Sequence, residues 1–171
     1  MPAPEPFDPI AILQALDAHR VGYIVIGALG RVIHGSDELT DGIDIVPSPR
    51  EENVRRLGLA LDDLNARRGD GRPAALEHDL AQPVLELGTD AGELKIVLEP
   101  AGTRGYDDLR RGSAPEPLGR GVRPSVASIG DHARMLAALS REQDLEPLQT
   151  VRRLIELDHA RSRGIGREID R

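Results

Sequence analysis

The feature that most constrains the fold is an apolar run, YIVIGA at residues 23–28, followed by a second, mostly apolar run, IDIV, at residues 43–46. Apolar runs of this length that stop at glycine or proline predict buried strands. Between them, Leu29, Val32 and Ile33 have the spacing of one face of a short helix. The pattern therefore predicts strand, glycine turn, helix and strand, with one carboxylate on the second strand.

The turn between the first strand and the helix is a candidate anion site. Backbone N–H groups are unpaired where a helix begins, and they attract phosphate. We therefore expect Gly27 and Ala28 to bind a nucleotide phosphate, with the hydroxyl of Ser36 nearby and Asp44 beside the turn. His34, at the end of the short helix, is interpreted as a capping or packing residue.

Hydrophobic periodicity and capping residues predict the other elements. The pair Asp8 and Pro9 is typical of a helix start, Ser48 begins a capping-box pattern, and Ser128 has the spacing to Asp131 of an N-cap. Helices are predicted at residues 9–20, 49–67, 106–110, 129–139 and from about 147 to no further than 164, and strands at residues 23–26, 43–46, 84–87, 94–98 and 124–127.

The order of these elements predicts an α+β fold with α/β character, in which helices flank a small mixed sheet and further helices follow. At 171 residues the chain has the length of one domain, with an α/β core at about residues 7–100 and a helical part at about residues 125–163. It has no cysteine, so disulfides and thiolate metal sites are excluded.

The composition of the chain limits the kinds of partner that it can bind. The 29 acidic residues outnumber the 22 basic ones, which argues against broad binding to nucleic acid or to anionic membranes. Only three aromatic residues are present, so bases cannot be held mainly by stacking. With no long apolar window and no apolar leader, we expect a cytoplasmic protein with no membrane association.

The segment GALGRVIHG at residues 27–35, with the TDGID run at residues 40–44, resembles the nucleotidyltransferase superfamily. It is most similar to the minimal bacterial branch that includes type IV toxin and antibiotic nucleotidyltransferases. The resemblance spans most of the chain and implies a transferase-like fold, Mg²⁺ and a nucleoside triphosphate. The REQDL segment at residues 141–145 half-matches a further pattern of the family, in which Arg141 could reach the triphosphate; the alternative is a surface pair of Arg141 with Asp144.

The metal-binding motif of that family is incomplete in this chain. Family members carry two aspartates separated by one residue, which places both carboxylates on one face of a strand. Asp44 matches the second, whereas Gly42 stands at the first position. Asp41 is adjacent but points to the opposite face of a regular strand, so it could serve only if the strand bulges there.

The third carboxylate of the family is replaced by a cation. Its pattern, Gly-x-Leu-Asp, reads GELK at residues 92–95, so Lys95 occupies the acid's position. An ammonium group repels a divalent cation. We hypothesise that Lys95 replaces the metal as a counter-ion, pairing with Asp44 and with Glu86 across the hairpin. The alternatives are that Lys95 is an ordinary surface residue and that Glu93 is a displaced metal ligand.

Three functions remain open from the sequence. The preferred one is a pseudoenzyme that binds a nucleotide or a protein partner without metal-dependent transfer. The second is an active minimal nucleotidyltransferase, related to toxin–antitoxin enzymes and acting on tRNA or a small molecule, with Asp44 and Asp41 as catalytic and metal-binding residues and with Glu93 as a further ligand. The third is a structural subunit that forms a homodimer through its C-terminal helices.

Overall fold

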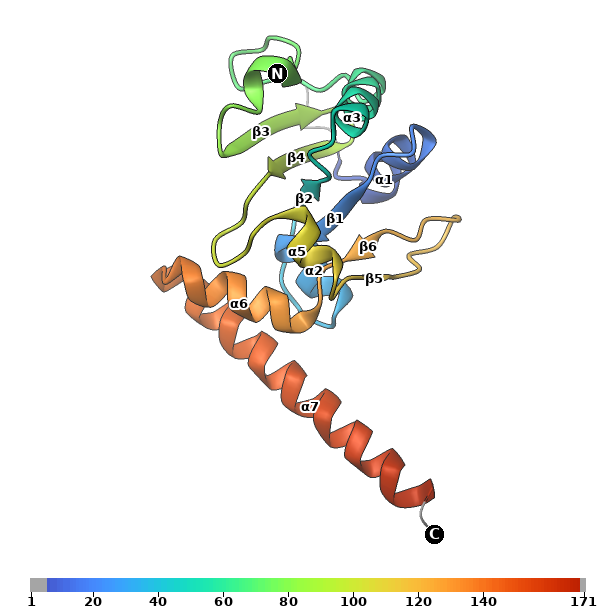
Figure 1. Cartoon of the computed structure of the whole chain (residues 1–171), viewed down its shortest axis with the longest axis vertical. Coiled ribbons are helices and arrows are strands. Elements are labelled where there is room, and N and C mark those ends of the chain that lie inside the picture. The colour runs from blue at the N-terminus through green and yellow to red at the C-terminus, as the bar shows by residue number, and fades with distance from the viewer. Residues whose placement is uncertain (1–5, 170–171) are drawn as a thin grey trace.

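The computed structural model describes the backbone of residues 6–169 and the side chains of residues 6–164. A six-stranded sheet with the order β3-β4-β2-β1-β6-β5 forms its centre (Figure 1). The strands are β1 (Tyr23–Ile26), β2 (Gly42–Pro47), β3 (Val84–Thr89), β4 (Gly92–Val97), β5 (Ala114–Pro115) and β6 (Ser125–Val126). The helices are α1 (Pro9–Ala18), α2 (Gly27–Ile33), α3 (Glu51–Asp63), α4 (Leu76–Asp79), α5 (Tyr106–Arg110), α6 (Ile129–Leu139) and α7 (Leu145–Ile169), with a 3-10 turn, η1, at Glu142–Asp144.

The sheet is mixed, as predicted. β1 runs antiparallel to β2 and parallel to β6, while β2 runs parallel to β4. β3 and β4 form the predicted hairpin, with Thr89 opposite Gly92. The predicted α+β class, with helices flanking a small mixed sheet and further helices at the C-terminal end, is therefore confirmed.

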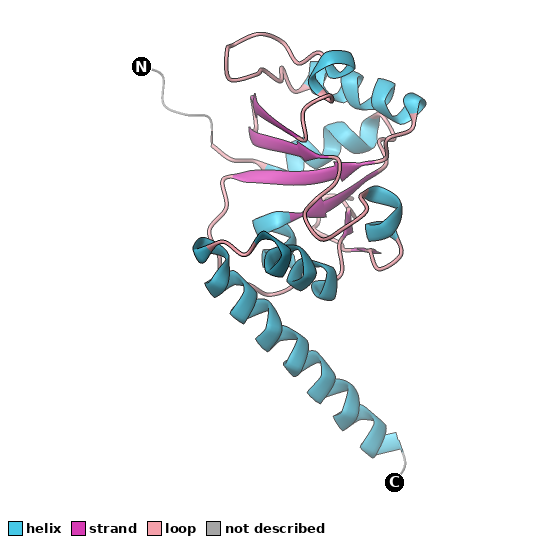
Figure 2. Cartoon of the chain, turned by 60° about the vertical axis from the view of Figure 1, so that its left-hand side comes forward, coloured by secondary structure: helices cyan, strands magenta, loops and turns pink. Residues whose placement is uncertain are grey.

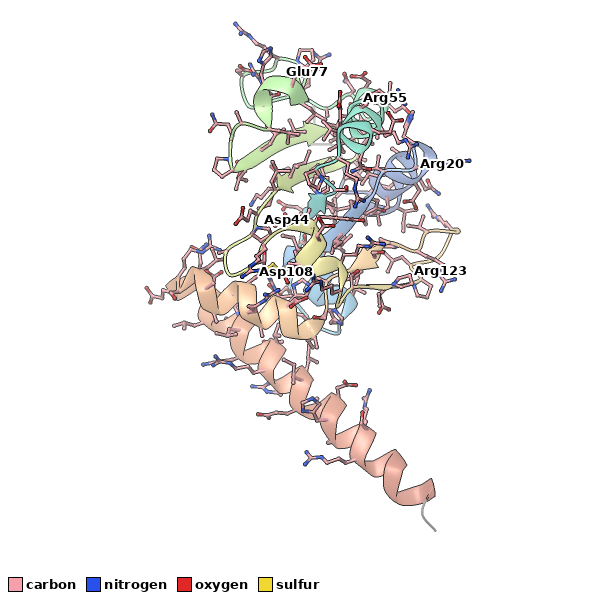
Figure 3. The ribbon with its side chains drawn as sticks, in the orientation of Figure 1. Arg20, Asp44, Arg55, Glu77, Asp108 and Arg123 are labelled. Carbon is pink, nitrogen blue, oxygen red and sulfur yellow. The ribbon has the colours of Figure 1, made fainter. Side chains whose placement is uncertain are left out.

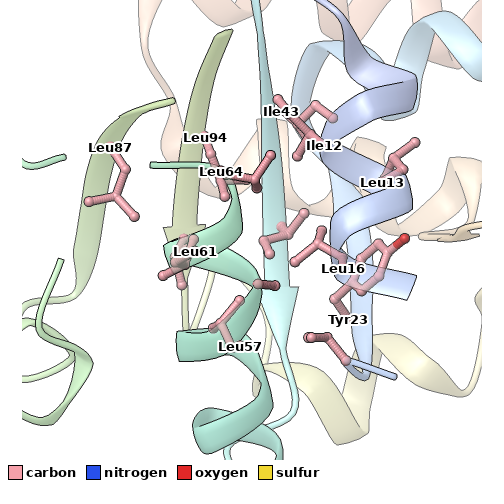
Figure 4. Packing of buried hydrophobic residues seen from close by; sticks show 14 of the residues in the cluster. Ile12, Leu13, Leu16, Tyr23, Ile43, Leu57, Leu61, Leu64, Leu87 and Leu94 are labelled. Atoms are coloured by element: carbon pink, nitrogen blue, oxygen red, sulfur yellow. The ribbon is translucent and has the colours of Figure 1, made fainter. Parts of the chain in front are cut away.

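The main core lies where α1 and α3 cover one face of the sheet (Figures 2 and 4). Ile12, Leu13 and Leu16 of α1 are fully buried, and Leu57 and Leu61 of α3 lie in the same cluster. Asp8 caps α1 by accepting a hydrogen bond from the backbone N–H of Ala11 at 3.1 Å, as its position predicted. The periodic apolar residues of both helices thus provide the cover that the sheet requires.

Two boundaries of α3 were predicted wrongly. Ser48 is buried and makes no capping-box bond; the helix instead begins at Glu51, after Arg50, with no side-chain cap. At the other end, Asn65 has a φ of 51°, a left-handed conformation that stops the helix at Asp63 instead of near residue 67. Elements α4, β5 and η1 are too short to produce a periodic pattern and were not predicted.

The C-terminal helices pack on each other. Ser128 caps α6 through a 3.0 Å bond from the N–H of Asp131, as predicted. Leu136 of α6 packs with Leu148 and Val151 of α7. Helix α7 continues past Gly164, where its end was predicted, and every residue from 156 to 164 is exposed as the helix leaves the body of the molecule (Figures 1 and 2). None of the described helices is both long and apolar enough to cross a membrane.

Candidate functional site

A cleft of about 750 Å³ lies at the end of the sheet where β2 and β4 face α6 and η1. Figure 3 shows Asp44 in this region, between the sheet and α6. Helix α2 contributes Gly27, Ala28 and Arg31 to the wall, and α6 contributes four residues at helical spacing. The volume falls within the range of roughly 300 to 1,000 Å³ that is typical of small-molecule sites.

Asp44 lies at the inner wall of the cleft, opposite Ile26 on β1 and Lys95 on β4. Its carboxylate packs against Gly27, where a Cβ would come within 2.5 Å of Asp44 Oδ2. Gly27 also has a φ of 70°, so glycine is required there both for conformation and for space. Among the side chains of residues 6–164, no hydrogen bond and no ion pair engages the Asp44 carboxylate, so it is a partly buried acid without a partner in that part of the chain.

Burial controls the ionisation of Asp44. Desolvation raises the pKa of the carboxyl above its ordinary value, and the charge of Glu86 adds to the rise. The nearby charges of Lys95 and Arg31 oppose it, but burial has the larger effect. Because burial disfavours the charged carboxylate, a ligand that donates hydrogen bonds to Asp44 would stabilise its charged form.

Lys95 lies beside Asp44 but pairs with a different acid. Its Nζ is 3.7 Å from Glu86 Oε1, across the β3–β4 hairpin, and 41% of its side chain is exposed. No ion pair within 4.0 Å joins Lys95 to Asp44 in the described part of the chain. Since a long, exposed pair of this kind contributes little, Lys95 acts on Asp44 mainly through its longer-range charge.

Position 42 has no space for a carboxylate. The register from Gly42 opposite Glu93 to Ile45 opposite Ile96 is continuous, so β2 has no bulge in this segment. A Cβ on Gly42 would lie 2.9 Å from the carbonyl oxygen of Glu93, which is closer than Cβ atoms approach backbone. Asp41 precedes the strand and is exposed at the rim, as is Glu93.

These residues do not form a metal centre of the expected kind. Among the residues that the structure describes, no group of three or more histidine, aspartate or glutamate side chains is arranged to hold a metal ion. Asp41, Asp44 and Glu93 all line the cleft, but they are separated along its wall by Gly42 and Lys95. The donor set therefore does not fit the two-metal site that nucleotidyl transfer uses.

The residues predicted to bind phosphate are only partly brought together. Gly27, Ala28 and Arg141 line the cleft. Ser36 does not; it is buried, and its hydroxyl donates to Glu38 Oε2 at 2.8 Å. The guanidinium of Arg141 donates to both oxygens of Asp144, at 2.6 and 3.0 Å, so it already has an anionic partner.

Two cleft residues were not identified from the sequence. Arg31 donates to both carboxylate oxygens of Glu38 at 2.8 Å and is largely buried. His132 is 1% exposed, and its Nε2 has no hydrogen-bond partner. His132 precedes Met135 and Leu136 by three and four residues, and this spacing on one helical face could have predicted that His132 is buried.

The residues around His132 explain why its imidazole is neutral. Its ring lies on Gly30, where a Cβ would be 2.7 Å from Nε2, and meets His34 edge-on with ring centroids 5.6 Å apart. Burial, together with the nearby charges of His34 and Arg31, lowers the pKa of His132 to about 3, against a smaller opposing effect of Glu38. His132 is therefore a neutral imidazole. His34 itself donates from Nε2 to the carbonyl of Ala127 at 2.8 Å, the packing role predicted for it.

Comparison with known proteins identifies the architecture. Neither a scan of protein-family models nor a search of curated proteins finds a match. Among solved structures, the lincosamide antibiotic adenylyltransferase LnuA, solved with lincomycin bound, is similar with a TM-score of 0.59 at 14% identity over 87% of this chain and 99% of that one. The antibiotic-resistance factor ANT(2'')-Ia is similar with a TM-score of 0.51 at 13% identity over 94% of each chain.

A third solved structure, TM1012 from Thermotoga maritima, a candidate nucleotidyltransferase, matches with a TM-score of 0.50 at 19% identity over 81% of this chain and 86% of that one. At these identities the likeness concerns the fold alone. The chain has a nucleotidyltransferase-like fold.

Proposed function

We propose that this chain uses its cleft to bind a nucleotide-class ligand or a protein partner and does not carry out metal-dependent nucleotidyl transfer. The observation that supports the proposal is the packing of Gly42 against the backbone of Glu93. A carboxylate cannot be placed at position 42 unless β2 and β4 separate. Asp44 therefore lacks the neighbouring acid that would share a metal ion with it.

The chemistry of nucleotidyl transfer explains why the missing acid beside Asp44 matters. Nucleotidyl transfer depends on positioning and on neutralising charge, which two divalent ions about 4 Å apart normally provide. Each ion needs several oxygen ligands. In this cleft the cross-strand neighbour of Asp44 is Lys95, whose charge repels a divalent ion. The fold thus retains the cleft while the ligand set for the metal is incomplete.

The test is calorimetric titration of the whole chain with each of the four nucleoside triphosphates, with Mg²⁺ and with EDTA. We expect Mg²⁺ alone to produce no binding heat, and any gain in triphosphate affinity from Mg²⁺, which neutralises phosphate charge, to be the same in the native chain and in Asp44→Asn. Asp44→Asn is compared with Asp37→Asn, which removes a charge from an exposed loop residue outside the cleft. Affinity that requires Mg²⁺ and is lost only in Asp44→Asn would contradict the proposal.

One observation favours a second function, that of an active minimal nucleotidyltransferase. Asp41, Asp44 and Glu93 line the same cleft, and the first and third are exposed, so their side chains are free to move toward a metal. Mg²⁺-dependent release of pyrophosphate from a triphosphate, abolished by Asp44→Asn and retained by Asp37→Asn, would establish this function.

A further inference from the structure

The charge of the cleft is opposite to the charge that a triphosphate needs. Three cationic side chains line the wall, whereas the carboxylates number six. The carboxylates are Asp41, Asp44, Glu86, Glu93, Glu99 and Asp144. Without a metal ion to offset them, these groups disfavour a ligand that carries several negative charges.

The three cations are also engaged already. Each faces a carboxylate of this chain, and the two arginines do so with two hydrogen bonds each, the strong form of such a pair. The pairs are Arg31 with Glu38 at 2.8 Å, Arg141 with Asp144 at 2.6 Å and Lys95 with Glu86 at 3.7 Å. A triphosphate would have to compete for each of them.

Asp44, in contrast to these cations, lacks a hydrogen-bonding partner among the described residues. Its carboxylate is partly buried and accepts no hydrogen bond within the described residues, so a ligand that donates would stabilise it. Sugar hydroxyl groups are suitable donors, because a carboxylate that accepts from a ribose hydroxyl is a common arrangement in nucleotide-binding folds.

The side of the cleft formed by α6 is apolar. Met135, Leu136 and Leu139 follow His132 at helical spacing along this wall, and Leu39 faces the cleft with 98% of its surface exposed. His132 lies behind this wall, because it is 1% exposed and its Nε2 is packed against Gly30, so it offers no hydrogen bond to a ligand. An aliphatic wall of this kind is suited to a flat, uncharged ring.

From the paired cations, the unpartnered carboxylate and this apolar wall, we propose that the cleft selects an uncharged nucleoside over a nucleoside triphosphate. The base lies against Met135 and Leu139, and the ribose hydroxyls donate to Asp44. The proposal rests on the proposed function, because it names the ligand that the cleft would bind without a metal. It requires no chemical step.

The experiment is calorimetry with adenosine, guanosine, cytidine and uridine, and with their triphosphates, all in EDTA. We expect at least one nucleoside to bind about tenfold more tightly than its triphosphate, a difference of about 1.4 kcal/mol. Leu139→Asp places a charge on the wall and should weaken that nucleoside at least tenfold. Leu157→Asp is the matched control, since Leu157 is 52% exposed on α7 and Leu139 is 39% exposed. The Leu157→Asp variant should bind the nucleoside as tightly as the native chain does.

Three results would overturn the inference. A triphosphate that binds more tightly than its nucleoside in EDTA would show that the cleft selects phosphate. Tighter binding of 1,4-diaminobutane than of any nucleoside would show that the carboxylates select a cation. Equal losses in Leu139→Asp and Leu157→Asp would show that the α6 wall is not the base site. Failure of the proposed function looks different, because it would appear as Mg²⁺-dependent binding or transfer that needs Asp44.

Discussion

The two faces of β2 and β4 have opposite character. On one face, Ile43, Ile45, Leu94 and Ile96 are at most 1% exposed and pack under α1 and α3. On the other face, the residues between them are charged and line the cleft. Since strand residues alternate between faces, a single pair of strands stabilises the fold on one side and presents a binding surface on the other. Mutations on the two faces should therefore have separable effects.

The largest expected effect is on the apolar face. Ile43→Ala removes three carbon atoms from a fully buried position, and the cavity should lower the free energy of unfolding by about 3 kcal/mol. Urea denaturation measures the change. Leu59→Ala is the control, because Leu59 is 41% exposed on α3. Equal losses in the two variants would show that the apolar face does not dominate stability.

Gly42→Asp tests the cleft face at the first residue of β2. Because the new Cβ would press on the Glu93 carbonyl at 2.9 Å, we expect a loss of roughly 2 kcal/mol in the free energy of unfolding. Gly69→Asp adds the same charge where no heavy atom lies within 4 Å, and it should have little effect. Both are measured with and without Mg²⁺. Stabilisation of Gly42→Asp by Mg²⁺ would show that the strands can open to form a metal site.

The smallest expected effect is a pH dependence on the cleft side. The pKa of His132 is about 3 in the folded chain and about 6.5 when unfolded, so the unfolded chain binds more protons between these values. Its stabilising contribution is complete above pH 6.5 and falls as the pH drops toward 3. Between about pH 7 and 5.5 the loss should be about 1 kcal/mol.

The matched variant for this prediction is His132→Leu, which keeps a buried side chain of similar size but cannot be protonated. Arg31, His34 and Glu38 surround the imidazole and remain in both proteins. Urea denaturation of the two proteins across this pH range isolates the contribution of His132. If both lose the same stability on acidification, His132 is not the group that titrates.

The predictable parts of the fold were those with strong local signals. Ser128 and its spacing to Asp131 located the start of α6, and the apolar alternation at residues 84–98 located the hairpin. The end of α7 was missed because Gly164 only weakens a helix and does not end it unless the backbone turns. The start of α3 was missed because Ser48 is buried near Gly22 and not free to cap.

In the site, the resemblance to nucleotidyltransferases predicted that Gly42 and Lys95 stand where those enzymes carry acids, a prediction that depends only on residue type. The sequence could not show that Gly42 is pressed against Glu93, because that contact depends on the register between β2 and β4, which are far apart in the chain. The hairpin did allow the pairing of Lys95 with Glu86 to be hypothesised, whereas the hypothesised pair of Lys95 with Asp44 is not found within the described residues. Ser36 was misplaced for a similar reason. Its hydroxyl is directed away from the cleft by Glu38, which in turn is held by Arg31.

The exposed half of α7 also determines how the molecule moves in solution. A compact chain of 171 residues would have a radius of gyration of about 15 Å, which corresponds to a body about 40 Å across. Helix α7, with 25 residues, is about 37 Å long, and its exposed half extends beyond the body. Rotational diffusion is therefore slower about axes perpendicular to this helix than about the helix itself. The N–H bonds of α7 lie along the helix axis, so their nuclear spin relaxation will differ from that of N–H bonds in the sheet. The orientation of α7 can therefore be measured from backbone amides alone.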